Sequence, residues 1–88
     1  MRVKTIFYSS HFARAFQKLP KFIQRQAIQK ETIFRQNCFE PRLKTHKLKG
    51  ELKDYWSFSI NHSYRILFEF IDKEQVGFID LGNHSIYK

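Results

Sequence analysis

The chain has 88 residues, 42% of them hydrophobic and ten of them phenylalanine, so it can fill the core of one small domain, spanning residues 1–88. Its net charge is +8 and unevenly spread: residues 1–53 carry thirteen Lys or Arg against three acids, and residues 54–88 carry three against five. Such a surface favours a polyanion or an acidic protein as partner. One cysteine, Cys38, excludes an internal disulfide and offers no metal-ligand spacing. The chain lacks both a membrane-spanning apolar run and a signal-peptide apolar region, so we expect a cytoplasmic protein without membrane association.

The first half of the chain is expected to form a strand and two helices. Residues 3–8 favour a strand, and the serines that follow can cap a helix. That helix carries one apolar stripe at spacing i, i+3, i+4 and i+7, formed by Phe12, Ala15, Phe16 and Leu19. Pro20 ends it and suits the start of a second helix, from Lys21 to about Gln36. His11, at the start of the first helix, is interpreted as a solvated residue.

The segment from residue 37 to residue 53 is the strongest electrostatic feature. Between Pro41 and Lys53 it holds five cations, the single acid Glu51, and His46. The five cations are Arg42, Lys44, Lys47, Lys49 and Lys53. Alternation in residues 44–49 is compatible with a short edge strand. These lysines could bind phosphates, or they could instead protect a sheet edge from aggregation.

Residues 55–84 predict three adjacent antiparallel strands. Alternating apolar residues, a polar break at residues 61–63 and a second break at residues 72–75 mark two hairpins. The first hairpin is expected to pair Trp56 with Phe68, Phe58 with Ile66 and Ile60 with Tyr64. The second is expected to pair Ile71 with Val76, Leu67 with Asp80 and Arg65 with Gly82.

This register divides the side chains between two faces, and burial of the apolar set should hold it in place. The apolar face would hold Trp56, Phe58, Ile60, Tyr64, Ile66, Phe68, Phe70, Ile79 and Leu81. The opposite face would hold Ser57, Ser59, Arg65, Leu67, Glu69, Phe78 and Asp80, with His84 added if pairing continues past Gly82. The two helices are expected to cover the apolar face.

Three segments together resemble a known family: HKLKG at residues 46–50, YRILFEF at residues 64–70 and GNHSIY at residues 82–87. Their order and spacing are similar to those of the RelE/ParE superfamily of bacterial type II toxins, most of all its RelE-like YafQ and YoeB branches. The resemblance covers nearly the whole chain. It implies an α+β fold, with an N-terminal strand and a two-helix hairpin packed on a curved antiparallel sheet. It also implies a ribosome-dependent mRNA endonuclease that a co-expressed antitoxin neutralises.

The resemblance also assigns residues. His46 matches the histidine of the YafQ-type H-x-L-x-G segment, and Arg65 matches the strand arginine of YoeB. His84 matches the late histidine of both branches, and Tyr87 is similar to the C-terminal aromatic residue. Glu40 resembles the glutamate that YoeB has before its proline, but it lies two residues further from Gly50. Ser59 stands where YafQ has a strand histidine, so the set is not that of any one branch.

These residues supply what metal-free and cofactor-free RNA cleavage requires. The ribose 2′-OH must lose a proton, the departing 5′-oxygen must gain one, and the phosphoryl charge must be stabilised. We therefore assign Arg65 to the scissile phosphate, His84 as general acid and His46 as base, although the acid and base labels could be exchanged. Lys44, Lys47 and Lys49, which cluster around His46 in the sequence, would bind RNA phosphates. Tyr87 would stack on a base or assist proton transfer.

Other functions stay open at this stage. A ParE-like toxin would inhibit DNA gyrase without cleaving RNA, and an inactive relative would only bind antitoxin. Arg65 could also simply pair with Glu69 or Asp80, and His84 could be a surface residue.

Overall fold

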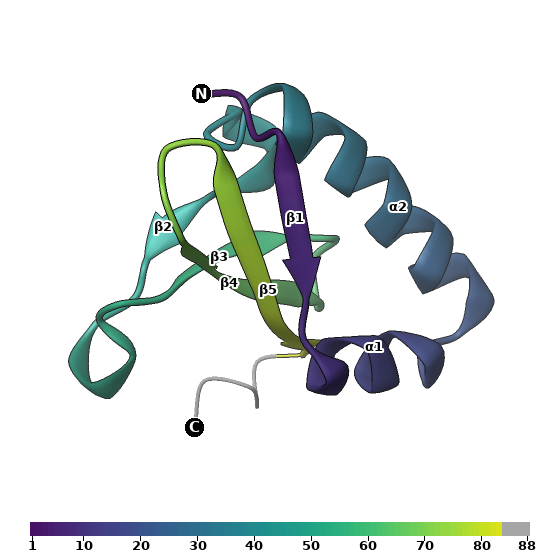
Figure 1. The fold of residues 1–88 in the computed structure, drawn as a ribbon. Coiled ribbons are helices and arrows are strands. Elements are labelled where there is room, and N and C mark those ends of the chain that lie inside the picture. The colour runs from purple at the N-terminus through teal and green to yellow at the C-terminus, as the bar shows by residue number, and fades with distance from the viewer. Residues whose placement is uncertain (84–88) are drawn as a thin grey trace.

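The computed structural model describes residues 1–83 and has two helices and a five-stranded sheet (Figure 1). The elements in chain order are β1 (Thr5–Tyr8), α1 (Ser10–Gln17), α2 (Lys21–Gln36), β2 (His46–Lys47), β3 (Trp56–Ser59), β4 (Arg65–Phe70) and β5 (Gln75–Gly82), with short 3₁₀ turns at Pro41–Leu43 and Gly50–Leu52. The strand order in the sheet is β1-β5-β4-β3-β2. The predicted α+β architecture is confirmed.

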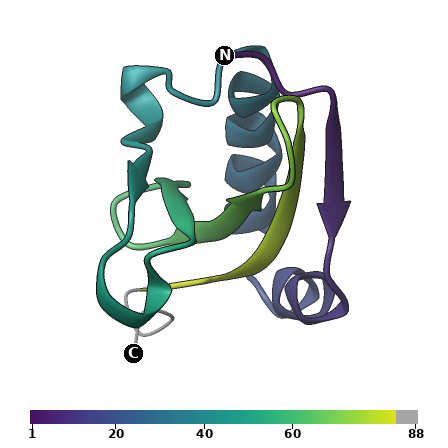
Figure 2. The same ribbon diagram turned by 60° about the vertical axis from the view of Figure 1, so that its left-hand side comes forward.

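The sheet is mixed rather than purely antiparallel. Strands β2 to β5 pair antiparallel, as expected, but β1 pairs with β5 in parallel. The chain leaves β1 at one end of the sheet and passes through both helices before it returns to build β2 at the opposite edge (Figures 1 and 2). The parallel neighbours β1 and β5 are therefore joined by the whole of the intervening chain, whereas a tight hairpin can join only antiparallel strands.

The helices begin and end where local chemistry predicts. The Ser9 side chain accepts a hydrogen bond from the backbone N–H of Phe12 at 2.9 Å, which caps α1, and its hydroxyl donates to the Ile79 carbonyl at 2.8 Å. Pro20 separates the two helices. Within residues 1–83, neither helix has the length and apolar character needed to span a membrane.

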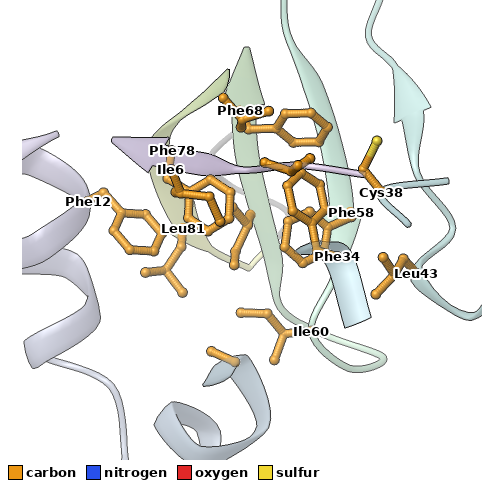
Figure 3. Close-up of a cluster of buried hydrophobic side chains, with 14 residues drawn as sticks. Ile6, Phe12, Phe34, Cys38, Leu43, Phe58, Ile60, Phe68, Phe78 and Leu81 are labelled. Carbon is orange, nitrogen blue, oxygen red and sulfur yellow. The ribbon is translucent and has the colours of Figure 1, made fainter. Parts of the chain in front are cut away.

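The core lies between α2 and the sheet and is rich in aromatic rings (Figure 3). Phe34 of α2 is fully buried, and its ring centroid lies 4.5 Å from that of Phe58, 4.9 Å from that of Phe68 and 5.5 Å from that of Phe78. Phe12 of α1 extends the cluster toward β5, with its centroid 5.2 Å from that of Phe78. The helices therefore cover one face of the sheet and leave the other for a site.

The first predicted hairpin is correct and the second is correct only in part. Phe58 pairs with Ile66, and Trp56 with Phe68. Arg65 pairs with Gly82 and Leu67 with Asp80, but Val76 pairs with Phe70 rather than with the predicted Ile71. The register shifts by one residue between Leu67 and Phe68, so Ile79 forms a bulge.

The bulge exchanges the expected roles of two neighbouring residues. Phe78, predicted on the polar face, is fully buried in the core, whereas Ile79, predicted in the core, is only partly buried. The larger side chain therefore fills the space beneath α2. Strict alternation could not reveal this, because a bulge adds one residue to one strand without changing the pattern of its neighbour.

Candidate active site

The face of the sheet opposite the helices carries the polar residues singled out above. Directly paired residues point to the same face, so His46, Ser57, Leu67 and Asp80 form one row across β2, β3, β4 and β5. The next row contains Ser59, Arg65 and Gly82. We call this side of the sheet, which the helices do not cover, the open face; Ser57, Ser59 and Leu67 on it are buried.

His46 has a defined orientation at the edge of the open face. Its ring Nδ1 lies 3.0 Å from the Lys44 carbonyl oxygen, and its Nε2 lies 3.5 Å from the buried Ser57 hydroxyl. A carbonyl oxygen can only accept a hydrogen bond, so Nδ1 carries the proton in the neutral ring and Nε2 presents its lone pair. Lys44 makes this possible by adopting a left-handed conformation, with φ at 54°. The arrangement gives His46 a proton-accepting nitrogen on the open face.

Arg65 is held by the turn that precedes it. Its Nη1 donates to the carbonyl of Asn61 at 2.9 Å, with longer contacts to the carbonyls of His62 and Tyr64. The Asn61 side chain in turn accepts hydrogen bonds from the backbone N–H groups of Ser63 and Tyr64 at 2.8 and 2.9 Å. Among residues 1–83, Nε and Nη2 of Arg65 have no hydrogen-bond partner. These two nitrogens can therefore donate to a phosphate.

The suggested pairing of Arg65 with Glu69 or Asp80 is wrong in the described structure. Asp80 instead pairs with His11, whose Nε2 lies 3.1 Å from the Asp80 Oδ1, and it also accepts from the Leu81 backbone N–H at 2.7 Å. His11 was expected to be only solvated. The sequence did not predict this contact, because hydrophobic periodicity gives no information about an exposed polar residue at a helix start. The contact forms because α1 begins beside β5.

The site residues predicted from sequence converge only in part. His46 and Arg65 share the open face, but β3 lies between their strands, and regular sheet spacings place their Cα atoms about 12 Å apart. The Arg65 guanidinium also reaches toward its own turn. Three strand spacings, about 14 Å, separate Asp80 from His46, too far for the His11–Asp80 pair and His46 to act on one phosphate. His84 and Tyr87 lie outside the described residues.

The lysines around His46 are exposed and, within residues 1–83, form no ion pair. Lys47 pairs with Trp56 and therefore points to the opposite side of the edge strand from His46. Of the three predicted phosphate contacts, Lys44 contacts the His46 ring through its backbone carbonyl.

Glu40 caps a turn in the structure. Its carboxylate accepts hydrogen bonds from both the backbone N–H and the side-chain Nε of Arg42 and so caps the turn at Pro41–Leu43. The hydrogen bonds from Arg42 hold the pKa of this carboxyl below its usual range. A carboxylate held in this way is a poor proton acceptor. Among the described residues, no three His, Cys, Asp or Glu side chains gather in a way that could hold a metal ion.

Comparison with known proteins gives a consistent result. Residues 7–82 match the family model for the RelE-like toxin of the type II toxin–antitoxin system HigB. The fold is similar to that of a YoeB/ParE toxin from Agrobacterium tumefaciens, with a TM-score of 0.78, 15% identity and coverage of 92% of this chain and 99% of that one. It is also similar to YafQ from E. coli, with a TM-score of 0.76, 18% identity and coverage of 99% and 98%.

A third solved structure of similar fold is the YoeB–YefM complex from Staphylococcus aureus, with a TM-score of 0.70, 24% identity and coverage of 96% of this chain and 99% of that chain. No curated protein sequence matches the chain. Because the identities with the solved structures are below 25%, these comparisons show a shared fold alone. The family model, which matches residues 7–82, shows the family to which the chain belongs.

Proposed function

This chain belongs to the RelE-like toxins of type II toxin–antitoxin systems, and on that premise we propose that it is an endoribonuclease that cleaves mRNA on the ribosome. The observation that carries the proposal is the state of His46. Its Nδ1 is committed to a backbone carbonyl, so Nε2 is the proton-accepting nitrogen; it lies 3.5 Å from the Ser57 hydroxyl, on the same face as Arg65. A base and a phosphate-binding guanidinium on one open face suit RNA cleavage.

In the proposed reaction His46 acts as the base, because its fixed tautomer accepts a proton at Nε2. The 2′-OH gives its proton to this nitrogen while its oxygen attacks the adjacent phosphorus. The bond from phosphorus to the 5′-oxygen breaks, and the departing oxygen takes a proton from the general acid, for which His84 stays the candidate. The products are a 2′,3′-cyclic phosphate and a free 5′-hydroxyl.

Arg65 would stabilise the charge on the phosphoryl oxygens. Its Nη1 remains bonded to the turn carbonyls, which hold the guanidinium in place, while Nε and Nη2 face the phosphate. Because about 12 Å separates the Cα atoms of Arg65 and His46, the substrate must bridge them, with the 2′-OH toward β2 and the phosphate toward β4. Lys44 and Lys49 would hold flanking phosphates, with Lys47 contacting RNA beyond the sheet edge, and Tyr87 would stack on a base.

An antitoxin is the proposed protein partner. Two solved structures of similar fold are toxin–antitoxin complexes, RelBE2 from Mycobacterium tuberculosis and YoeB–YefM from Staphylococcus aureus. The excess of Lys and Arg in residues 1–53 favours an antitoxin with an acidic segment that orders on binding.

The decisive experiment measures ribosome-dependent cleavage of a reporter mRNA by primer extension. His46→Ala and Arg65→Ala should each lower the cleavage rate by a factor of about 10² to 10⁴, since each removes one charge- or proton-handling group. His62→Ala is the matched control, because this exposed histidine lies in the turn before Arg65 and should leave the rate unchanged. Near-normal cleavage by folded His46 and Arg65 variants would contradict the proposal. Inhibition of purified gyrase with intact mRNA would point instead to a ParE-like activity.

A further inference from the structure

Among the residues that the structure describes, Glu69 is a partly buried carboxylate without a partner. Four acidic side chains in residues 1–83 are partly buried, and three of them are engaged: Glu31 by Tyr8 and Arg35, Glu40 by Arg42, and Asp80 by His11. Within the same residues Glu69 makes no hydrogen bond and no ion pair. The chain has a net charge of +8, so cations are plentiful, yet this partly buried carboxylate has none beside it among the described residues. We therefore interpret it as an acceptor for the hydrogen-bond donors of a ligand.

The surroundings of Glu69 include a glycine and two exposed apolar side chains. Glu69 pairs with Gly77, which pairs with Phe7 of β1, so the three form one row on the open face. A Cβ on Gly77 would lie 3.6 Å from both the Cγ and the Oε2 of Glu69, which shows that the carboxylate lies over the glycine. Ile71 approaches the same Gly77 position to 3.7 Å, and Phe7 lies on the other side of Gly77 in the row; their exposed fractions are 52% and 51%. A single hydrogen-bond acceptor therefore stands beside an exposed aromatic ring.

This place is continuous with the proposed active site. Glu69 and Arg65 lie four residues apart on β4 and on the same face, about 13 Å from Cα to Cα. An RNA strand that crosses the sheet from His46 to Arg65 and then turns along β4 would bring a neighbouring nucleotide to Glu69. The inference made here rests on the proposed function, because that function is what places RNA on the open face.

The chemistry of Glu69 selects which part of the nucleotide it can face. A carboxylate repels phosphate but accepts hydrogen bonds from base N–H groups, as acidic side chains do from the amino group of cytosine. An exposed aromatic ring next to it offers a stacking surface for the same base. Guanine presents two adjacent donors to a carboxylate, whereas uracil presents one N–H between two carbonyl oxygens that the carboxylate repels.

We propose that Glu69 and Phe7 form a base-recognition subsite that selects a nucleobase with N–H donors on its pairing edge, guanine foremost and uracil least. A cation from a protein partner is the competing occupant for the same acidic and aromatic pair. The nucleobase is favoured because Glu69 shares its strand and face with Arg65, the proposed phosphate ligand.

The test maps cleavage sites of the full chain on translated reporter mRNAs in which one position near the cut is varied through all four bases. Wild type should favour guanine over uracil at one position fixed relative to the cut, and Glu69→Gln should reduce that preference by about tenfold. Phe7→Leu should lower cutting at every base of that position while keeping their order. Glu74→Gln is the matched control, because Glu74 is an exposed acid paired with Lys4 and should leave base preference unchanged.

A titration without ribosomes keeps this inference separable from the proposed function. Backbone amide shifts of Phe7, Glu69 and Gly77 should respond to the trinucleotide GGG more strongly than to UUU, whether or not the chain cuts mRNA. If wild type responds more strongly to GGG than to UUU but does not cleave mRNA, the endonuclease proposal is overturned and the subsite is retained. Unchanged base preference in an active Glu69→Gln variant would overturn the subsite. So would Glu69→Gln weakening antitoxin binding while base preference stays as in wild type.

Discussion

Because of the bulge at Ile79, we predict that truncating Phe78 lowers the stability of the fold much more than truncating its neighbour Ile79. Phe78 is fully buried, and its ring centroid lies 5.2 Å from that of Phe12, 5.5 Å from that of Phe34 and 5.8 Å from that of Phe58. Truncating such a ring leaves a cavity, so Phe78→Ala should lower the free energy of unfolding by about 3–5 kcal/mol. Ile79 is partly exposed, so Ile79→Ala should cost only about 1 kcal/mol.

Urea unfolding followed by circular dichroism measures both values. A domain of 88 residues has a typical stability of about 4–13 kcal/mol, so Phe78→Ala can remove most of it. If Phe78→Ala does not fold, the milder pair Phe78→Leu and Ile79→Val keeps the comparison, again with the larger loss at Phe78. Equal losses, or a larger loss at Ile79, would refute the observed register and restore the strict alternation expected from the sequence.

Three further changes test local features around the open face. Lys44→Val should destabilise the fold by about 1–3 kcal/mol in urea unfolding, because a β-branched residue resists the positive φ, whereas Lys44→Asn should stay within about 0.5 kcal/mol. Asn61→Ala should cost roughly 2–3 kcal/mol, since it removes two turn hydrogen bonds and one to Gln26, whereas Gln26→Ala, which loses only the last, should cost about 1 kcal/mol. The Arg42 hydrogen bonds lower the pKa of Glu40 in the folded state, so their stabilisation is present above the ordinary value of 4.5 and is lost as pH falls through the lowered pKa. The stability difference between wild type and Glu40→Gln should therefore be constant from pH 5 to 7 and shrink below pH 4.5, and a difference independent of pH would argue against this cap.

Local patterns in the sequence determined the elements and half of the sheet. The i, i+3, i+4, i+7 stripe before Pro20 predicted α1, and alternation around residues 61–63 predicted the β3–β4 register, because one buried face leaves a single acceptable pairing. Arg65 also lies on the face where the sequence placed it, and His46 lies on the same face. These outcomes depend on interactions between residues close in the chain, which periodicity records.

Only the tertiary structure decided which side chains meet across the fold. The parallel pairing of β1 with β5 and the contact of His11 with Asp80 join segments about seventy residues apart. The burial of Phe78 in place of Ile79 depends on the packing of its ring against Phe12 of α1 and Phe34 of α2. The isolation of Glu69 is likewise visible only once its neighbours in space are known. Such contacts are chosen by how whole layers pack, since a helix or strand can satisfy its own backbone in many placements and burial of the shared core selects one.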